Sequence, residues 1–271
     1  VVLSAGPMIF RTCRAVVRAL AAAALPGAGP AGPVYLIPGH DEASRRALVA
    51  RQGGVDVALP VGSPAWTDSI AAEARVPVLG QTCRRHHAYV DEDADPAMAV
   101  AVIADMVPTD PCGEGPNHVL IHRAAAARLV PVIAGALLEK TIPFSADAGV
   151  GKILADLHLA TADAAMAAEA GVHLELVDGV DSAAAVIAGH GPGLSDGIVT
   201  NDRAVAARFA ALVDSACVCL NASTRFSDGA QFGMGAQVTV STGRLHARGP
   251  LGIDELTTYK YVVTGKGQTL G

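Results

Sequence analysis

The sequence is poor in aromatic residues, and its cysteines lack the spacing typical of a zinc site or a disulfide framework. Phenylalanine, tyrosine and tryptophan make up 4% of the 271 residues, and tryptophan occurs once. The five cysteines are odd in number, include no CxxC pair and stand at positions 13, 83, 112, 217 and 219. This pattern argues against a disulfide-rich secreted domain and against a cysteine zinc site. A reducing cytoplasm is therefore the expected location.

Long apolar runs and an excess of basic charge are also missing. The longest apolar stretches, such as LVPVIAGALL, have about half the roughly 20 residues that a membrane-spanning helix needs. The formal net charge of −6 gives no reason to expect nucleic acid or an anionic membrane as a partner. The start, VVLSAGPM, lacks the basic region of a signal peptide and has the pattern of a β-strand from its first residue. We therefore expect the chain to be the C-terminal part of a longer protein.

Short β-branched runs alternate with alanine-rich helical patterns along the chain. One series contains GPVYLIP, VDVALP and VPVLG, and a second runs from HAYVDEDAD through HVLIHR, VHLELVD, GIVT and ACVCLN. Strands that alternate with helices predict a largely parallel sheet. In the second series, Asp95 is a suitable N-cap for a helix from Pro96 to Met106. The sequence thus predicts an α/β protein with two lobes and a seam near residues 80–88.

A cysteine occurs in a stretch that cannot be helical. Residues 108–122 read PTDPCGEGPNHVLIH, and their prolines and glycines oppose a helix because proline lacks an N–H and glycine adds backbone entropy. Cys112 is therefore expected on a loop that precedes a strand from His118 to His122. On this local sequence, Cys112 could be a nucleophile or a small buried hydrophobic residue.

From Asn221 onward the alternation of helix and strand patterns stops. Residues 221–260 read NASTRFSDGAQFGMGAQVTVSTGRLHARGPLGIDELTTYK. This segment resembles the C-terminal part of the gamma-glutamyl phosphate reductase family, within the aldehyde dehydrogenase superfamily. The resemblance continues more weakly through HGPGLSDGIVTNDRAVAARFAALVDSA, HAYVDEDADPAMA and VDVALPVGSPAW. GMGAQV is not a dinucleotide fingerprint, because it does not open a helix and lacks the third glycine.

The resemblance implies an aldehyde dehydrogenase-like fold with two parallel-sheet lobes. Residues 1–87 would be the C-terminal portion of a dinucleotide-binding domain, residues 88–257 the catalytic domain, and residues 258–271 an oligomerisation strand and tail. The complete protein would be a homo-oligomer. This chain alone would be inactive, because its cofactor lobe is incomplete.

The resemblance also implies a reaction. It is the NADPH-dependent reduction of L-glutamyl 5-phosphate to L-glutamate 5-semialdehyde in proline biosynthesis. In the family a single cysteine, on a loop that enters an LLVH-type strand, is the nucleophile, and Cys112 followed by VLIH occupies that position. Its thiolate would displace phosphate and form a thioester, which accepts hydride readily.

The same resemblance suggests residues that bind the substrate. Glutamyl 5-phosphate carries a carboxylate and a phosphate, and the planar fork of Arg225 can hold an oxyanion through two hydrogen bonds. Phe232 and Gly233 would form the wall beside the thiol. Arg248 could equally well have a structural role, tying its loop to a following helix, because arginine stems also pack.

Three further residues are expected to contact the cofactor. Ser4 would end the strand that meets the adenosine ribose, and Gly62 and Ser63 would lie at a helix N-terminus that favours a pyrophosphate. The local sequence of Gly62 and Ser63 is equally consistent with a tight turn and an N-capping serine. Ser4 replaces an arginine of the family, so NADP is expected but NAD stays open.

No metal site is expected from the sequence. His118 and His122 alternate on one strand face, but they lack a neighbouring acidic or cysteine ligand at helical spacing. Ordinary strand histidines are the better interpretation.

Several positions depart from the family pattern. The stretch after Cys112 is one residue longer, and Pro192, Leu194 and Gln237 replace a hydroxyl residue, a histidine and a glutamate. Two alternatives therefore remain open: a catalytically silent relative that serves as an assembly or binding module, and a reductase of another acyl phosphate or aldehyde.

Overall fold

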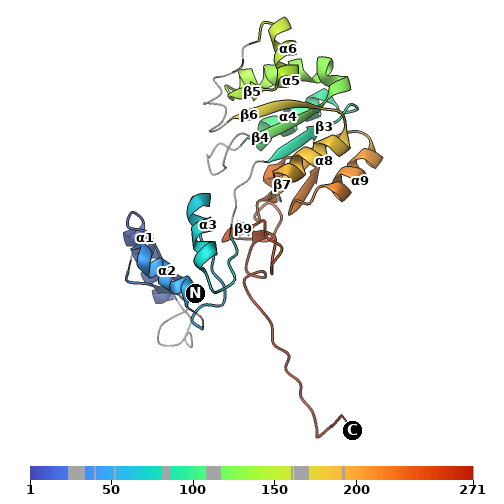
Figure 1. The fold of residues 1–271 in the computed structure, drawn as a ribbon. Coiled ribbons are helices and arrows are strands. Elements are labelled where there is room, and N and C mark those ends of the chain that lie inside the picture. The colour runs from blue at the N-terminus through green and yellow to red at the C-terminus, as the bar shows by residue number, and fades with distance from the viewer. Residues whose placement is uncertain are drawn as a thin grey trace. The chain divides into compact units, whose positions relative to one another are not determined.

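The computed structural model describes residues 1–23, 34–39, 41–51, 53–80, 86–107, 117–159, 161, 171–190 and 193–270. Cys112 lies outside these residues. The chain divides into two compact units, Val1–Gln81 and Thr82–Gly271 (Figure 1). In the described part of the chain, no helix combines the length and the apolar character that crossing a membrane requires.

The first unit contains short parallel strands and three helices. Its elements are β1 (Val2–Leu3), α1 (Phe10–Ala23), β2 (Tyr35–Leu36), α2 (Glu42–Ala50) and α3 (Pro64–Glu73). β1 pairs with β2 in parallel, and an isolated parallel bridge joins Ala58 to Val78. The buried apolar cluster of this unit is small and contains Val49, Ala58 and Ile70.

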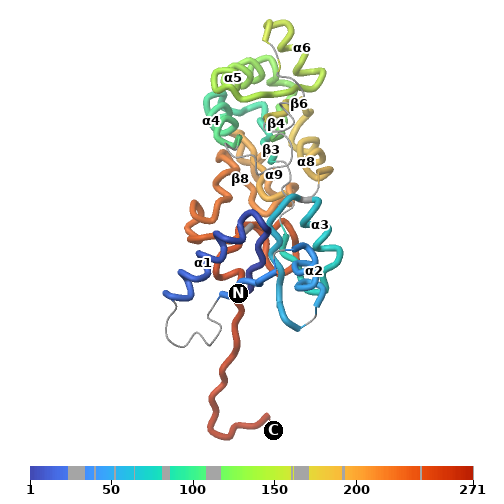
Figure 2. The backbone as a smooth tube through the Cα atoms, turned by 90° about the vertical axis from the view of Figure 1, so that its left-hand side faces the viewer, coloured from blue at the N-terminus to red at the C-terminus, as the bar shows by residue number. Residues whose placement is uncertain are grey.

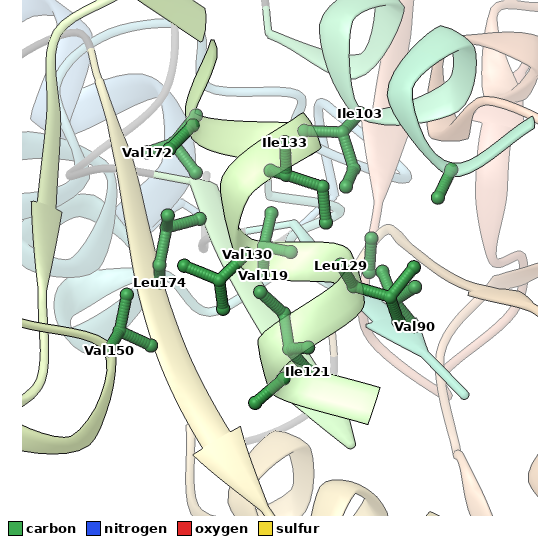
Figure 3. Packing of buried hydrophobic residues seen from close by; sticks show 14 of the residues in the cluster. Val90, Ile103, Val119, Ile121, Leu129, Val130, Ile133, Val150, Val172 and Leu174 are labelled. Atoms are coloured by element: carbon green, nitrogen blue, oxygen red, sulfur yellow. The ribbon is translucent and has the colours of Figure 1, made fainter. Parts of the chain in front are cut away.

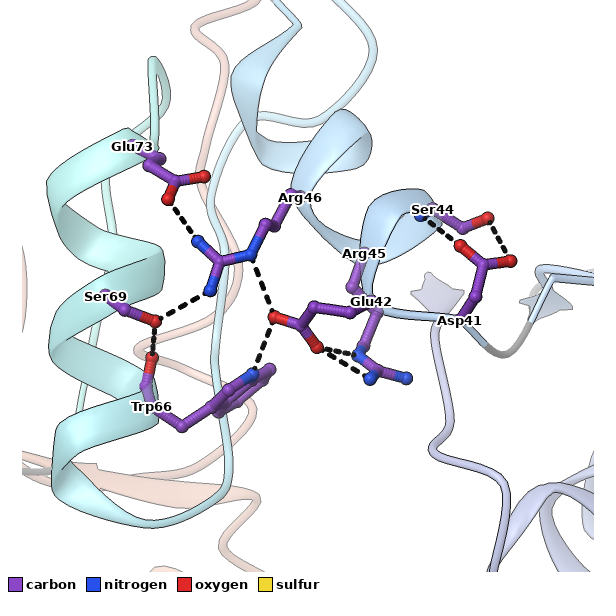
Figure 4. A network of polar contacts seen from close by, with 8 residues as sticks. All are labelled: Asp41, Glu42, Ser44, Arg45, Arg46, Trp66, Ser69 and Glu73. Carbon is purple, nitrogen blue, oxygen red and sulfur yellow. Dashed lines mark hydrogen bonds and ion pairs between the residues drawn. The ribbon is translucent and has the colours of Figure 1, made fainter.

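A polar network holds α2 against α3 (Figure 4). Glu42 of α2 accepts a hydrogen bond from Trp66 Nε1 of α3 at 2.9 Å and also contacts Arg46 Nε at 3.0 Å. Arg46 in turn reaches Glu73 and donates to Ser69 Oγ at 3.1 Å. A hydrogen bond from Arg45 is the main reason why the pKa of Glu42 lies below its usual value. The single tryptophan of the chain is thereby fixed in orientation.

The second unit is built on a six-stranded sheet. Its strand order is β5-β6-β4-β3-β7-β8, and every neighbouring pair is parallel. The strands are β3 (His87–Val90), β4 (Asn117–His122), β5 (Phe144–Ala146), β6 (Val172–Val177), β7 (Ser195–Val199) and β8 (Cys217–Leu220). Together with the first unit, this arrangement confirms the predicted α/β fold with a largely parallel sheet.

Helices connect these strands, and a short antiparallel hairpin follows them (Figure 2). The helices are α4 (Pro96–Met106), η1 (Arg123–Ala125), α5 (Ala126–Glu139), α6 (Ala148–Asp156), α8 (Val180–Gly189), α9 (Arg203–Leu212) and η2 (Thr224–Ser227). The hairpin consists of β9 (Thr239–Ser241) and β10 (Gly249–Leu251). α4 begins and ends where the sequence predicts, and Asp95 caps it by accepting from the backbone N–H of Met98.

The two faces of the sheet bury different apolar sets. Alternate strand residues such as Val90, Val119 and Leu174 pack against α4, α5 and α6 (Figure 3). The residues between them, including Tyr89 and Leu120, pack against α8 and α9 on the other face. Burial on both faces is typical of a parallel sheet.

The C-terminal tail forms no strand within the single chain. Residues 258–270 have no regular structure and are exposed, with Tyr261 84% and Val263 91% accessible. The expected oligomerisation strand is therefore not formed here, because a strand needs a neighbouring strand and these residues pair with none of the described strands. Its pairing with another subunit stays a prediction.

Leu129 tests the core on the α5 face. Leu129 is fully buried, so truncation to alanine should lower the free energy of unfolding by about 2–5 kcal/mol through lost burial and a residual cavity. Leu138, on the same helix, is 42% exposed, and Leu138→Ala should cost about 0.5 kcal/mol. Urea unfolding followed by circular dichroism measures both. Equal losses would contradict the packing described here.

Gly62 tests the packing around Trp66. A Cβ on Gly62 would lie 2.7 Å from Trp66 Cε3, so Gly62→Ala must displace the indole ring. Such overpacking typically costs about 1–3 kcal/mol. Gly80→Ala is the matched control in the same unit, because its Cβ would meet the nearest atom at 3.9 Å. We expect Gly62→Ala, and not Gly80→Ala, to shift the tryptophan emission and to lower its thermal midpoint.

Candidate functional site

The residues on either side of the Cys112 stretch are tied together. α4 ends at Met106, and Asn117 is the first residue of β4. Asn117 Nδ2 donates to the carbonyl of Met106 at 3.3 Å, and its backbone N–H donates to Gly171 at 3.0 Å. The candidate nucleophile therefore belongs to a segment whose two anchors are buried and close to each other, although Cys112 itself lies outside the described residues.

Arg225 lies beside one of these anchors. Its guanidinium pairs with Asp105, in the last turn of α4, at 2.9 Å, and both side chains are at least half exposed. Phe232 is half exposed, and Gly233 has a positive φ of 75° with open space where a Cβ would stand. Gln237 Oε1 accepts from the backbone N–H of Gly229 at 2.8 Å and so fixes the loop that carries Phe232 and Gly233. The residues expected to bind substrate thus lie in the second unit, and the side chains of Arg225 and Phe232 are accessible.

The three expected cofactor residues all lie in the first unit. Ser63 is the N-cap of α3, but its side chain makes no capping hydrogen bond, and the helix has a proline in its first turn. The buried hydroxyl of Ser4 has no hydrogen-bond partner among the described residues. Gly62 leaves no room for a side chain, because an added Cβ would lie 2.7 Å from the Trp66 ring. A helix N-terminus without a side-chain cap and a buried unpaired hydroxyl both fit a phosphate-bearing dinucleotide.

Arg248 has a structural role in the described chain. It pairs with Asp214, which follows α9, at 2.9 Å and also donates to the Asp214 carbonyl. Arg244 pairs with the same carboxylate. Arg248 therefore fastens its loop to the connection that precedes β8. The alternative of a tie to a following helix is not what the structure shows.

The two cysteines of β8 have thiol pKa values above the ordinary value, unlike a reactive cysteine. Burial raises the pKa of Cys217, and it raises the pKa of Cys219 to about 11. A thiol with a raised pKa holds its proton at neutral pH and is a poor nucleophile. Cys217 and Cys219 are therefore expected to be unreactive near neutral pH.

His118 and His122 lie on one face of β4 but at opposite ends of it. Four residues along a strand span about 13 Å, which is too far for a shared ligand. His122 Nδ1 accepts from the backbone N–H of Ala124 at 3.1 Å, whereas His118 Nε2 contacts Glu175 of β6 at 2.8 Å. Sequence reasoning missed that His118 lies among histidines of other strands. The signal was present, because three strands each begin with a histidine at the first or second position.

Known proteins resemble this chain in sequence. No family model matches it. The gamma-glutamyl phosphate reductase of Caulobacter sp. (strain K31) is 43% identical over 234 residues, which are 83% of this chain and 55% of that protein. That of Sphingopyxis alaskensis is 40% identical over 272 residues, covering 99% of this chain and 63% of that protein. The chain thus spans about three fifths of the length of these curated relatives.

Solved structures resemble it in fold. The crystal structure of gamma-glutamyl phosphate reductase from Thermotoga maritima matches with a TM-score of 0.78 and 32% identity, over 88% of this chain and 58% of that one. A probable aldehyde dehydrogenase from Listeria monocytogenes matches with a TM-score of 0.70 and 16% identity, over 98% of this chain and 69% of that one, which shows the fold alone. With 40 to 43% identity to curated relatives over most of its own residues, the chain is similar in sequence to gamma-glutamyl phosphate reductases, and its fold is aldehyde dehydrogenase-like.

Proposed function

We propose that the complete protein reduces L-glutamyl 5-phosphate to L-glutamate 5-semialdehyde, with NADPH as the hydride donor, in proline biosynthesis. The observation that carries this proposal is the homology to gamma-glutamyl phosphate reductases over most of this chain, including the catalytic unit. The names of these relatives give the substrate class. The division into a cofactor portion, a catalytic domain and an oligomerisation tail belongs to the same proposal.

Cys112 is proposed as the nucleophile. Its thiolate attacks the acyl carbon of glutamyl 5-phosphate, a C–S bond forms, and phosphate leaves with the electrons of the broken C–O bond. A thiolate suits this step because it is intrinsically nucleophilic, and the thioester divides one difficult reaction into two easier ones. The anchoring of Met106 to Asn117 supports the proposal, because a nucleophile displaced by about 1 Å can lose roughly 100-fold in rate.

Arg225 is proposed to hold an anionic group of the substrate. Its side chain is accessible, and Asp105 holds it beside the end of α4, where the Cys112 stretch begins. A guanidinium can exchange a solvent-exposed carboxylate partner for a phosphate or carboxylate at little cost, because exposed ion pairs are weak. Phe232 and Gly233 are proposed to border the same space.

Ser4, Gly62 and Ser63 are proposed to contact NADP. The backbone N–H groups of the first turn of α3 suit the pyrophosphate, and the unpaired Ser4 hydroxyl can bond to a ribose. The cofactor, when bound, supplies the hydride, while Cys112 holds the acyl group and releases the aldehyde as the C–S bond breaks. The preference for NADP over NAD rests on the family resemblance.

The nucleophile can be tested in the full-length protein. Cys112→Ala should lower turnover by several powers of ten, each corresponding to about 1.4 kcal/mol of barrier. Cys219→Ala is the matched control, because the raised pKa of Cys219 makes it inert, and it should keep most of the activity. Phosphate-dependent oxidation of glutamate semialdehyde with NADP measures both. More than a tenth of wild-type turnover in a folded Cys112→Ala protein would refute the assignment.

Arg225 can be tested in the same assay. Arg225→Gln should raise the KM for glutamate semialdehyde or phosphate by at least about tenfold, because a charge-assisted pair to an anion is lost. Arg208→Gln removes an equally exposed arginine that pairs with Asp181 at 2.5 Å, and its kinetics should match the wild type. If the two variants behave alike, Arg225 does not bind substrate.

A further inference from the structure

Histidines from adjacent strands form a row across the sheet of the second unit. The parallel register aligns His87 of β3 with His118 of β4, and His118 with His173 of β6. Residues in register on parallel strands point to the same face, and this face is the one that α8 covers. The row lies near the amino ends of the three strands, because His87 is the first residue of β3 and the other two histidines are the second residues of β4 and β6.

His190 adds a ring from the covering helix. It is the C-cap residue of α8, and its ring centroid lies 5.0 Å from that of His87 and 5.8 Å from that of His118. His190 Nδ1 is 3.2 Å from His87 Nε2 and 3.0 Å from the carbonyl of Val186. One ring nitrogen from each of His87, His118 and His190 lies within 4.8 Å of the other two.

Two of these rings, those of His87 and His118, each contact a carboxylate. Asp196 is fully buried in β7, and its Oδ1 accepts a hydrogen bond from His87 Nδ1 at 2.7 Å. A carboxylate accepts the proton of Nδ1–H, so the lone pair of His87 is on Nε2, the atom that faces His190. On the other side of the cluster, a carboxylate oxygen of Glu175 lies 2.8 Å from His118 Nε2. In the tautomer that carries the proton on Nε2, the lone pair of His118 is on Nδ1.

We propose that His87, His118 and His190 bind a divalent transition-metal ion, with zinc as the reference ion. A carboxylate contacts two of these three imidazoles, and histidines supported by carboxylates in this way commonly ligate zinc. With Zn–N bonds of about 2.0–2.1 Å, neighbouring ligands of a tetrahedral ion are about 3.3 Å apart. The 3.2 Å between His87 Nε2 and His190 Nδ1 matches one edge of that tetrahedron.

The surroundings favour a cation at this place. His190 is at the C-terminus of a ten-residue helix, where the helix dipole favours positive charge. Asp196 and Glu175 contribute negative charge directly behind two of the ligands. Binding requires that the proton of His190 move from Nδ1 to Nε2, so that Nδ1 presents its lone pair to the ion. His190 is only partly buried, so its ring can make this change without repacking the core.

A second set overlaps with this one. One ligand atom from each of His118, His173 and Glu175 also lies within 4.8 Å of the other two. The set of three histidines is the better candidate for a metal site. In it, Glu175 and Asp196 both support a ligating histidine, whereas in the second set Glu175 would itself be a ligand. His173 Nδ1 is 2.9 Å from Ser145 Oγ. His173 therefore provides a matched control within the same row.

The test is a titration of the full chain with Zn²⁺ against a fluorescent zinc chelator, after accessible thiols have been blocked with iodoacetamide. The wild type should bind one ion per chain. His190→Gln should weaken binding by at least about tenfold, because outer partners alone are worth 10–100-fold and a direct ligand is worth no less. His173→Gln should change the affinity by less than about threefold. Circular dichroism of both variants checks that they are folded.

Visible spectroscopy of the wild-type protein with Co²⁺ tests the proposal without any substituted protein. Co²⁺ in place of Zn²⁺ should give the intense visible bands of a tetrahedral ion, without the near-ultraviolet charge-transfer band of a thiolate ligand. No saturable zinc binding by the wild type would overturn the proposal. So would equal affinities of the wild type and His190→Gln, or a larger loss in His173→Gln than in His190→Gln.

Discussion

The parallel register of β3 with its neighbours β4 and β7 is the constraint on which the second unit depends. These three strands are central, and their side chains alternate between two apolar layers, so a shift of one residue would exchange the buried sets of both faces. The same register aligns His87 with His118 and brings Asp196 to the ring of His87. The same strand register therefore determines both the packing of the apolar core and the polar contacts of His87.

Local sequence was sufficient to predict those elements that are determined by residues close together in the chain. Asp95 followed by Pro96 defines the start of α4, because a capping carboxylate and a first-turn proline act within a few residues. The alternation of β-branched and alanine-rich runs was likewise enough to predict a parallel α/β sheet. The motif from Asn221 to Lys260 then identified the relatives, and the comparisons confirmed that resemblance.

What the sequence could not supply was contact between distant residues. His118 and His122 attract attention because they are close in the chain, whereas the neighbours of His118 are 31 residues earlier and 55 and 72 residues later, at His87, His173 and His190. Strand order decides such contacts, and the order β6-β4-β3-β7 is not sequential. The tail after Thr257 forms no strand in the single chain, and its predicted pairing with another subunit stays a prediction. The roles proposed for Cys112 and the cofactor residues still await their tests.

The placement of Trp66 has a consequence for how cooperativity is measured. The one tryptophan lies in the first unit, while both large apolar clusters lie in the second. Tryptophan fluorescence therefore follows the first unit alone, whereas circular dichroism follows the helices of both units, and the two unfolding curves are expected to coincide if the units unfold as one cooperative system. Superimposable curves would reveal an energetic coupling between the units, and separate curves would assign each unit its own stability.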